Sequence, residues 1–578
     1  MNDLNAIIQR YESLKRQQDF WIPTYEVLAQ YILMRKIYFK NQVQPGPFIY
    51  NLNYDGTAIN AVRVMAASIF GQVWPSASES FEFQPEIAQE DTIYGDEDSF
   101  NFAKDVNGVM STQLSNPSSG FLTAWLEALT DLIIFGTAFV YVIATGDLSQ
   151  PLRFQALDAK SIVVDEDDTG KINTAFITHR LTVASVVSRY GLQNCSSQVQ
   201  QKYKDTKNHS ERVVVLQAIM PNISRAPGKR GKDNMAWKSV HIDITHGRHE
   251  LERGGFNEMP IIGMRFYKNP GEVLGRSPAM DAISDIKELN KNAELFTKAG
   301  EFALNPPKLV YKEHILGGQP VWKSGAWIMA HTAGRMGSDR PPIEALHIVK
   351  NPAWAGERIK ALQEQVQNHF LIDRLTDLNN RSRQTMGEAV IRNNLREHIT
   401  GPVLSRILTE GLQPILDRAF NILLEAGFFG VVRGSIEDLH MRVNGIQPKY
   451  LSESFINARM SGVKGYKIRF ISPAARAQYH EQLAGMQQLR QSLMEIAQLG
   501  KPEVLDLIDW DEWTRLEHFV SGASLKVLNS SEKVAQIRQM AAQMQAQAQQ
   551  MAQAQQEAEI LKSAGKGIAD LGGSGVAA

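Results

Sequence analysis

A cluster of three histidines is the first candidate for site chemistry in this chain. His241, His246 and His249 lie within nine residues of one another, and imidazole is a common ligand of transition metals. If the segment is a strand, its side chains alternate between two faces, so His241 and His246 point in opposite directions. The one cysteine, Cys195, is distant in sequence, and no obvious carboxylate completes a ligand set. We therefore expect ordinary strand or turn histidines, with no metal and no cofactor.

Two loops resemble ion-binding motifs without meeting their chemical requirements. The string Gly228-Lys229-Arg230-Gly231-Lys232 lacks the spacing and the hydroxyl of a nucleotide-binding P-loop. The acidic run from Asp165 to Gly170 begins like a calcium loop, but Phe176 stands at the twelfth position, where a bidentate glutamate is needed. These segments are predicted to be a solvated basic loop and the turn of a β-hairpin.

The sequence also lacks the short motifs that carry common enzyme chemistry. It contains no Gly-x-Ser-x-Gly elbow, no His-Glu-x-x-His helix and no Gly-x-Gly-x-x-Gly fingerprint. Its 61 Lys and Arg residues balance 62 Asp and Glu residues, for a net charge of −1. That balance argues against a strongly basic reader of DNA sequence and against an acidic disordered chain. We expect a protein that is not an enzyme.

The elements that must position any functional residue come from a long, mostly globular chain. At 578 residues with 43% hydrophobic content, two or three cores are expected. The single cysteine excludes an intramolecular disulfide framework and indicates a reduced thiol in a protein made in the cytosol. The N-terminus has no leader pattern, and the apolar run from Leu132 to Ile143 is shorter than the roughly 20 residues of a membrane span. A soluble chain without a membrane segment is predicted.

Helices and then strands are predicted in the first half of the chain. An opening helix should bury one face, and a second helix follows Asp55-Gly56-Thr57. Gly136 is predicted to separate a helix from a strand, and residues 162–177 are predicted to form a β-hairpin. This order indicates an α+β unit. The opening helix should bury Leu4, Ile7, Ile8, Tyr11 and Leu14.

Two long helices joined by a small β-rich segment are the most informative feature. Ser277-Pro278 is a strong helix start, because serine caps the first turn and proline suits the first helical position. The helix should run to Asn305-Pro306-Pro307, about 37 Å at 1.5 Å per residue. Residues 304–350 are glycine-rich and non-helical, and a second helix is predicted over 353–371.

A polar link with Arg381 and Arg383 follows, and these arginines are candidates to touch a phosphate backbone. Thr385-Met386-Gly387-Glu388 matches a capping box, so a helix should start there and run to about Ala426. Gly401-Pro402 and Pro414 predict kinks or breaks in it. The Gln-, Ala- and Met-rich segment 531–562 is predicted to be a helix, either bundled with copies of itself or partly frayed, before a disordered end.

An ordered set of short blocks resembles the head-to-tail connector (portal) proteins of short-tailed bacteriophages. The blocks cover roughly residues 10 to 540, and their order is more specific than any one of them. The departures are Phe266, where tryptophan is more usual, and Gln72-Val73-Trp74-Pro75. The blocks are Arg16–Trp21, Tyr25, Ala29–Ile32, Tyr54–Ala58, Met65–Gly71, Glu258–Pro260, Arg265–Phe266, Gly271–Glu272, Gly275–Pro278, Asp285–Asn290, Asn305–Pro307, Thr385–Ala389 and Ile471–Pro473.

The resemblance implies an α+β, mainly helical subunit of a ring, dodecameric in portals, at one capsid vertex of the virion. Double-stranded DNA would pass through the ring without sequence recognition during packaging and ejection. The implied regions are an α+β wing (1–276), a first stem helix (277–303), a clip (304–350), a second stem helix (351–372), a channel loop (373–384), the rest of the wing (385–472), a helical crown (473–562) and a disordered tail (563–578).

The resemblance also implies contacts for particular residues. Arg381, Arg383, Lys287 and Lys291 are the expected DNA-channel contacts. The clip would dock the terminase and tail adaptor or nozzle proteins, and capsid and scaffolding proteins are the other expected partners of a particle assembled in the host cytoplasm. The clip residues expected to dock partners are Lys312, His314, Trp322, Lys323, Trp327 and Arg335.

Two other functions compete with a DNA conduit. A tail adaptor or internal virion protein would bind the connector without forming the channel, but adaptors are usually far shorter and lack the two-helix arrangement. An enzyme of nucleic-acid processing would need a hydrolytic site, and no motif for one is present.

Overall fold

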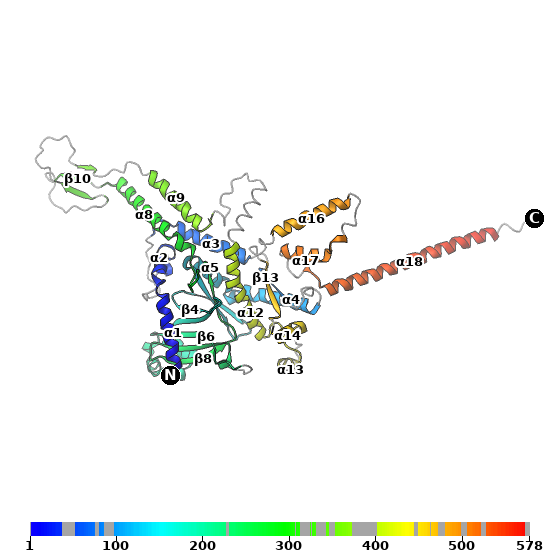
Figure 1. Ribbon diagram of the computed structural model, residues 1–578, viewed down its shortest axis with the longest axis horizontal. Coiled ribbons are helices and arrows are strands. Elements are labelled where there is room, and N and C mark those ends of the chain that lie inside the picture. Colours follow the sequence, from blue (N-terminus) through cyan, green and yellow to red (C-terminus); the bar gives the residue numbers. More distant parts are fainter. Residues whose placement is uncertain are drawn as a thin grey trace, which may run out of the picture. The chain divides into compact units, whose positions relative to one another are not determined.

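The computed structural model shows two compact units (Figure 1). Unit 1 comprises Met1–Ser76, Gln113–Ile422 and Pro473–Glu481, and unit 2 comprises Ala77–Thr112, Leu423–Ser472 and Gln482–Ala578. Helices are the commoner element, so the predicted α+β class with mainly helical content is confirmed. The structure describes residues 2–36, 53–75, 80–85, 97–226, 231–306, 308–311, 324, 326–330, 343–345, 353–372, 401–443, 449–462, 464–471, 480–498, 506–521 and 527–572.

A five-stranded antiparallel sheet in unit 1 is covered by the first helix. Helix α1 (Asn2–Gln18) lies along this sheet (Figure 1) and buries Ile7, Ile8 and Tyr11 against side chains that include Phe176 and Leu216. Leu4 and Leu14 pack at the margin of the same cluster, so the predicted buried face is confirmed. The strands, in sheet order, are β4 (Ile162–Glu166), β5 (Ile172–Thr182), β6 (Arg212–Pro221), β7 (Trp237–Asp243) and β8 (His249–Phe256).

The acidic run between β4 and β5 is a hairpin turn, as predicted. Asp167 Oδ1 accepts hydrogen bonds from the backbone N–H groups of Thr169 (3.0 Å) and Lys171 (2.9 Å). Gly170 has a φ of +78°, which an L side chain adopts only with strain. The carboxylate therefore stabilises the turn itself.

The histidines near β7 contact protein side chains, and one of them has a carboxylate partner that the sequence reasoning missed. His246 Nδ1 lies 3.2 Å from Asp243 Oδ2, and Asp243 is fully buried. His241 Nδ1 lies 2.9 Å from the hydroxyl of Tyr190 at the end of α6 (Val183–Tyr190). Across the described ranges, no three His, Cys, Asp or Glu side chains are grouped closely enough to hold a metal. Helix α7 (Ser197–Lys204) follows α6.

Gly136 joins a buried helix to a second sheet. It ends α5 (Phe121–Phe135) with a φ of +78° and begins β2 (Thr137–Ala144), where the change from helix to strand was predicted. A Cβ atom on Gly136 would lie 2.3 Å from the carbonyl oxygen of Gly275, so only glycine fits. Strand β2 is central in an antiparallel sheet, between β3 (Leu152–Leu157) and β9 (Ile261–Arg265).

Aromatic contacts connect α5 to the two helices that precede it. Tyr25 on α2 (Ile22–Ile32) meets Phe135 edge-on at 5.2 Å between ring centroids. Trp74, at the end of α3 (Thr57–Val73), meets Phe121 at 4.8 Å. Such offset and edge-to-face pairs add to apolar burial. Together these helices form the base from which the longest helix of unit 1 projects.

The predicted interruption near Pro414 takes the form of a π-helical turn. Residues 401–406 are helical and lead directly into η7 (Ile407–Leu412), a π-helix, and then α12 (Gln413–Glu425). In an α-helix the ring of Pro414 would collide with the carbonyl group of Glu410, four residues earlier. The wider π turn relieves that collision without breaking the helix. The capping box at Thr385–Glu388 lies outside the described residues.

Unit 2 combines short helices with one two-stranded sheet. Strand β1 (Phe81–Pro85) pairs antiparallel with β13 (Tyr466–Phe470), close to the strand predicted over 466–471. Asn107 secures this sheet by accepting a hydrogen bond from the Phe83 N–H (2.7 Å). The helices are α4 (Glu97–Ser115, its last residues in unit 1), α13 (Ile436–Val443), α14 (Glu453–Met460), α16 (His480–Gln498), α17 (Trp510–Ser521) and α18 (Ser531–Gly572).

The C-terminal helix α18 is longer than predicted. We expected disorder from residue 563, yet the helix runs to Gly572, because alanine, leucine and lysine continue to favour a helix and isolated glycines only weaken it. Its first turns are held by Arg538, which donates two 2.7 Å hydrogen bonds to Asp511 on α17. No helix among the described residues is long and apolar enough to cross a membrane.

Candidate functional site

The longest helix of unit 1, α8 (Pro278–Leu304), starts from a fully buried cap. Ser277 Oγ accepts a hydrogen bond from the Met280 N–H (3.1 Å) and donates one to the carbonyl oxygen of Ile134 (2.8 Å). Pro278 occupies the first turn. The predicted start is confirmed, and the second bond fixes the direction in which the helix leaves the body.

A returning helix packs along α8, and a small sheet lies between them in sequence. Helix α9 (Ala353–His369) lies beside α8 (Figure 1) and buries Leu362 and Val366, while α8 buries Ile286 and Leu289. The sheet has the order β11 (Trp327–Ala330), β10 (Lys308–Tyr311), β12 (Ile343–Ala345), with a parallel and an antiparallel pair. The predicted pair of helices with a β-rich segment between them is therefore present.

Polar contacts fix the two helices to each other. Arg358 on α9 donates a 2.7 Å hydrogen bond to Glu288 on α8, and His369 Nε2 lies 2.9 Å from Asp285 Oδ2. These side chains are partly exposed, so each pair adds little stability and mainly sets the register. At the far end of α8, Ser324 donates to the carbonyl oxygen of Asn305 (3.0 Å).

A short segment before α3 ties both helices to the body, and the sequence reasoning missed this role. The Tyr54 N–H donates to Asn290 Oδ1 on α8 (2.7 Å), and Gln363 Nε2 on α9 donates to Asp55 Oδ2 (2.8 Å). Asp55 Oδ1 accepts from the Thr57 N–H (2.8 Å) as α3 begins. An aspartate two residues before a helix was the only signal, and it indicated a cap rather than a tether.

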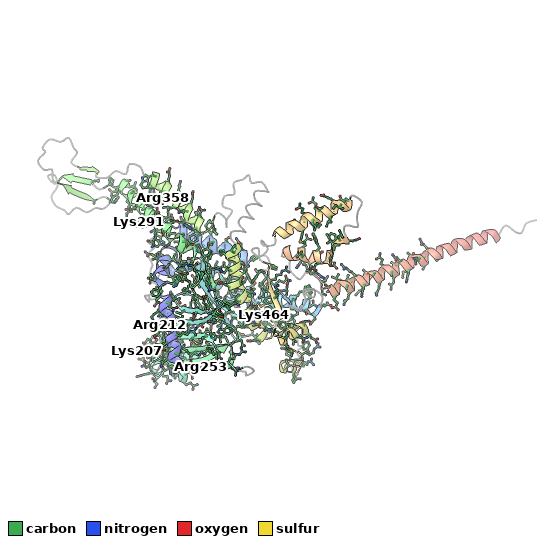
Figure 2. All side chains as sticks on the ribbon, viewed as in Figure 1. Lys207, Arg212, Arg253, Lys291, Arg358 and Lys464 are labelled. Carbon is green, nitrogen blue, oxygen red and sulfur yellow. The ribbon has the colours of Figure 1, made fainter. Side chains whose placement is uncertain are left out.

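Lysines form a row on the face of α8 that points away from its buried side. Lys287, Lys291 and Lys298 recur at steps of four and seven residues, which places them on one face of the helix, about 100–140° around the axis from Ile286. Figure 2 shows Lys291 projecting from α8 and Arg358 from α9. Lys287 and Lys291, two of the predicted channel contacts, are both exposed.

Glu294 neutralises part of this row. It accepts hydrogen bonds from Lys298 and from Lys291 (3.0 Å), and these bonds hold the pKa of Glu294 below its ordinary value. Among the described residues Lys287 forms no ion pair. Helix α8 carries three lysines and five carboxylates, so it is not a basic surface. The carboxylates are Asp281, Asp285, Glu288, Glu294 and Glu301.

Most of the other predicted contact residues cannot be placed. Trp327 is the first residue of β11, where its backbone pairs with Lys308. The remaining candidates lie outside the described residues. They are Arg381 and Arg383 for the channel, and Lys312, His314, Trp322, Lys323 and Arg335 for the clip.

A long capped helix, a returning partner and a small sheet between them define a connector-like structural subunit. Residues 4–446 match the family described as "Bacteriophage head to tail connecting protein". The chain belongs to this family of phage connectors, and the predicted resemblance is confirmed.

Two curated relatives agree with the family. The chain is 26% identical over 555 residues to the "Probable portal protein" of Bordetella phage BPP-1, covering 93% of this chain and 91% of that protein. It is also 26% identical over 421 residues to the "Portal protein" of Salmonella phage epsilon15, covering 71% of this chain and 69% of that protein.

Proposed function

We propose that this connector is the portal of its phage, a ring of identical subunits at one capsid vertex through which duplex DNA is packaged and ejected. The family and the two portal relatives support this function. Helices α8 and α9 would form the stem, the segment 304–350 the clip, residues 1–276 and 385–472 the wing, and residues 473–562 the crown. Twelve copies, as in portals generally, would close the ring.

Exposed apolar side chains on the stem carry the proposal of a ring. Trp354 on α9 is 71% exposed, and Leu295 and Phe296 on α8 are 50% and 42% exposed. Their exposure in a single subunit fits burial against a neighbouring stem, because a closed ring needs two different faces that meet head to tail.

The charge of the stem supports a channel through which DNA slides. A lumen that neutralised many phosphates would hold DNA with a strong dependence on salt and would slow its passage. The lysine row on α8 offers a few positive charges, and the single negative charge of Glu294 is shared between two of these lysines. Lys287, Lys291, Arg381 and Arg383 remain the proposed DNA contacts, and they would touch phosphates without reading bases.

The proposed partners follow from the two ends of the stem. The clip would dock the terminase, which supplies the energy for packaging, and later the tail adaptor or nozzle proteins. Capsid and scaffolding proteins would meet the wing, and assembly would take place in the host cytoplasm before the portal becomes part of the virion. No enzymatic step is assigned to the chain.

Electron microscopy and mass photometry of the purified full-length chain test the ring. We expect rings with a central hole, and we expect Leu295→Glu with Trp354→Glu to leave folded monomers. Ile223→Glu, at a residue 97% exposed between β6 and β7, is the matched control and should keep the ring. A wild-type chain that stays monomeric at all concentrations, or a stem variant that assembles normally, would contradict the proposal.

A further inference from the structure

The π turn η7 lies between the helical residues 401–406 and α12, and these two segments differ in how far their side chains are buried. After it, Arg418 on α12 is buried and donates hydrogen bonds to the carbonyl oxygens of Val142 (3.0 Å) and Glu258 (3.2 Å). Before it, Leu404 is the one buried side chain among residues 401–406. Any change in the turn would therefore move residues 401–406 and leave α12 in place.

The buried Arg265 binds Glu410 of the turn. Glu410 Oε2 accepts hydrogen bonds from both the backbone N–H and the Nε–H of Arg265, each at 3.2 Å. The Arg265 side chain is 5% exposed, and its other nitrogens donate to Glu166 Oε2 and to the carbonyl oxygen of Gly170, both at 2.8 Å. Since Arg265 is fixed by β9 and by the β4–β5 hairpin, Glu410 has a defined docking position.

Gly411 of the turn packs closely against Trp125 and Met264, and the indole N–H of Trp125 lacks a hydrogen-bond acceptor among the described residues. A Cβ atom on Gly411 would lie 3.1 Å from Trp125 Cη2 and 3.2 Å from Met264 Sδ, so the turn sits against these side chains with little room. Trp125 is fully buried, and its indole N–H has no hydrogen-bond partner among the described residues. A buried donor without a partner costs free energy, so this packing is not at its most stable.

The hydrogen bonding of the turn shows what the alternative state would be. The Gln413 N–H bonds to the carbonyl oxygen of Leu408, five residues earlier, whereas an α-helix uses the residue four earlier. Pro414 disfavours the α arrangement at Glu410 because it lacks an N–H and its ring needs space. The Glu410–Arg265 contact therefore favours the π register, and Pro414 disfavours the α register. Glu410 also lies 3.8 Å from Arg406 Nε, an i, i+4 pair that an α-helix can keep.

We propose that η7 is a register switch. The turn converts between π and α hydrogen bonding, the Glu410–Arg265 contact stabilises the π state, and conversion rotates residues 401–406 against the fixed α12 by about 100°, the angle of one helical residue. This inference goes beyond the proposed portal function and depends only on contacts within unit 1. It gives residues 401–406 two defined orientations.

Hydrogen exchange at the amides of residues 404–413 in the full-length assembled protein tests the switch. Glu410→Gln should speed exchange about tenfold, because the π state loses its anchor while Pro414 still disfavours the α state. Pro414→Ala should slow exchange about tenfold, because the α turn becomes available and its missing hydrogen bond forms. Glu272→Gln, which breaks the Arg276–Glu272 pair elsewhere, is the matched control and should change nothing here.

The double variant separates a switch from a simple loss of stability. In Pro414→Ala the turn is expected to be α-helical, and the α state does not use the Arg265 contact. Adding Glu410→Gln to Pro414→Ala should therefore have no effect on exchange. A structure of Pro414→Ala by electron microscopy should also show residues 401–406 rotated. Faster exchange in both single variants, additive effects in the double variant, or an unrotated helix in Pro414→Ala would overturn the proposal.

Discussion

Gln363 Nε2 donates a 2.8 Å hydrogen bond to Asp55 Oδ2, so α9 is tied to the start of α3 across 308 residues of sequence. The neighbouring Tyr54 N–H makes the equivalent tie to Asn290 on α8. One short segment therefore holds both α8 and α9, and the two helices are positioned by hydrogen bonds as well as by the burial of Leu289 and Val366.

Removing the Asp55 carboxylate should destabilise the protein. Asp55→Ala leaves Gln363 and the Thr57 N–H without their acceptor, and we expect the free energy of unfolding to fall by about 1–3 kcal/mol. Chemical denaturation of the purified chain measures this change. Asp168→Ala, at an exposed turn, is the control, and equal losses in the two variants would contradict the tether.

Glu294→Gln should make the assembled stem bind DNA more tightly. The substitution frees Lys291 and Lys298 from their shared carboxylate, so each engaged lysine can neutralise a phosphate. Each added contact should steepen the slope of log affinity against log salt by about 0.9. Fluorescence titration of labelled duplex DNA over a range of salt concentrations measures both effects.

A charge-matched variant separates this local effect from the overall charge of the stem. Glu357→Gln removes the same charge from an exposed position on α9, and Glu357 forms no ion pair with the residues that the structure describes. We expect a smaller change in affinity and in slope for Glu357→Gln. If the two variants bind DNA alike, Glu294 has no special role in masking the lysines.

Acid should destabilise the fold in part through His241. Burial, followed by the charges of Arg189 and His179, lowers the pKa of His241 to about 3. The unfolded chain takes up this proton near the ordinary pKa of about 6.5. The folded chain does not, so stability should fall as pH drops from about 6.5 towards 3, by up to about 1.4 kcal/mol per pH unit.

Thermal melts of His241→Gln between pH 7 and pH 4 check this titration. The variant should be the less stable protein at pH 7, because it loses the 2.9 Å hydrogen bond between the imidazole Nδ1 and the Tyr190 hydroxyl, and should lose less stability on acidification. His249→Gln changes an exposed histidine, and its melting temperature should depend on pH in the same way as that of the wild type. Parallel melting curves for the wild type and His241→Gln would contradict the burial argument.

Gly136→Ala should be among the most disruptive small substitutions in the chain. The new methyl group would meet the Gly275 carbonyl oxygen at 2.3 Å, at a φ of +78° that already disfavours alanine. We expect a loss of more than about 2 kcal/mol or failure to fold. Gly146→Ala has the same φ with open space around it, so it should lose only the backbone part, about 1 kcal/mol. Similar melting temperatures for both variants would rule out the steric clash.

Local sequence rules predicted the elements well. Ser277 and Pro278 are the residue types preferred at a helix start, and the spacing of Ile7, Ile8 and Tyr11 follows the helical period. The start of α8 and the buried face of α1 could therefore be predicted without knowing the fold. The π turn was foreseen only as an interruption near Pro414. Its form depends on Arg265, which no local pattern connects to Glu410.

The contacts that position the stem could not be predicted, because they join distant segments. Tyr54 and Asn290 lie 236 residues apart, and an asparagine on an exposed helix face is ordinarily solvated. The carboxylate partner of His246 was missed for a different reason. Asp243 ends β7, and its side chain turns back to bind the chain after the strand, a contact that the alternation of strand residues does not predict.

A reconstruction by electron microscopy of the full-length chain assembled on duplex DNA tests the central claim most directly. The account predicts a closed ring in which α8 lines the lumen, with Lys287, Lys291 and Lys298 facing DNA in a passage wide enough for the duplex. A ring with α8 on its outer surface, or a passage too narrow for duplex DNA in every state, would contradict it.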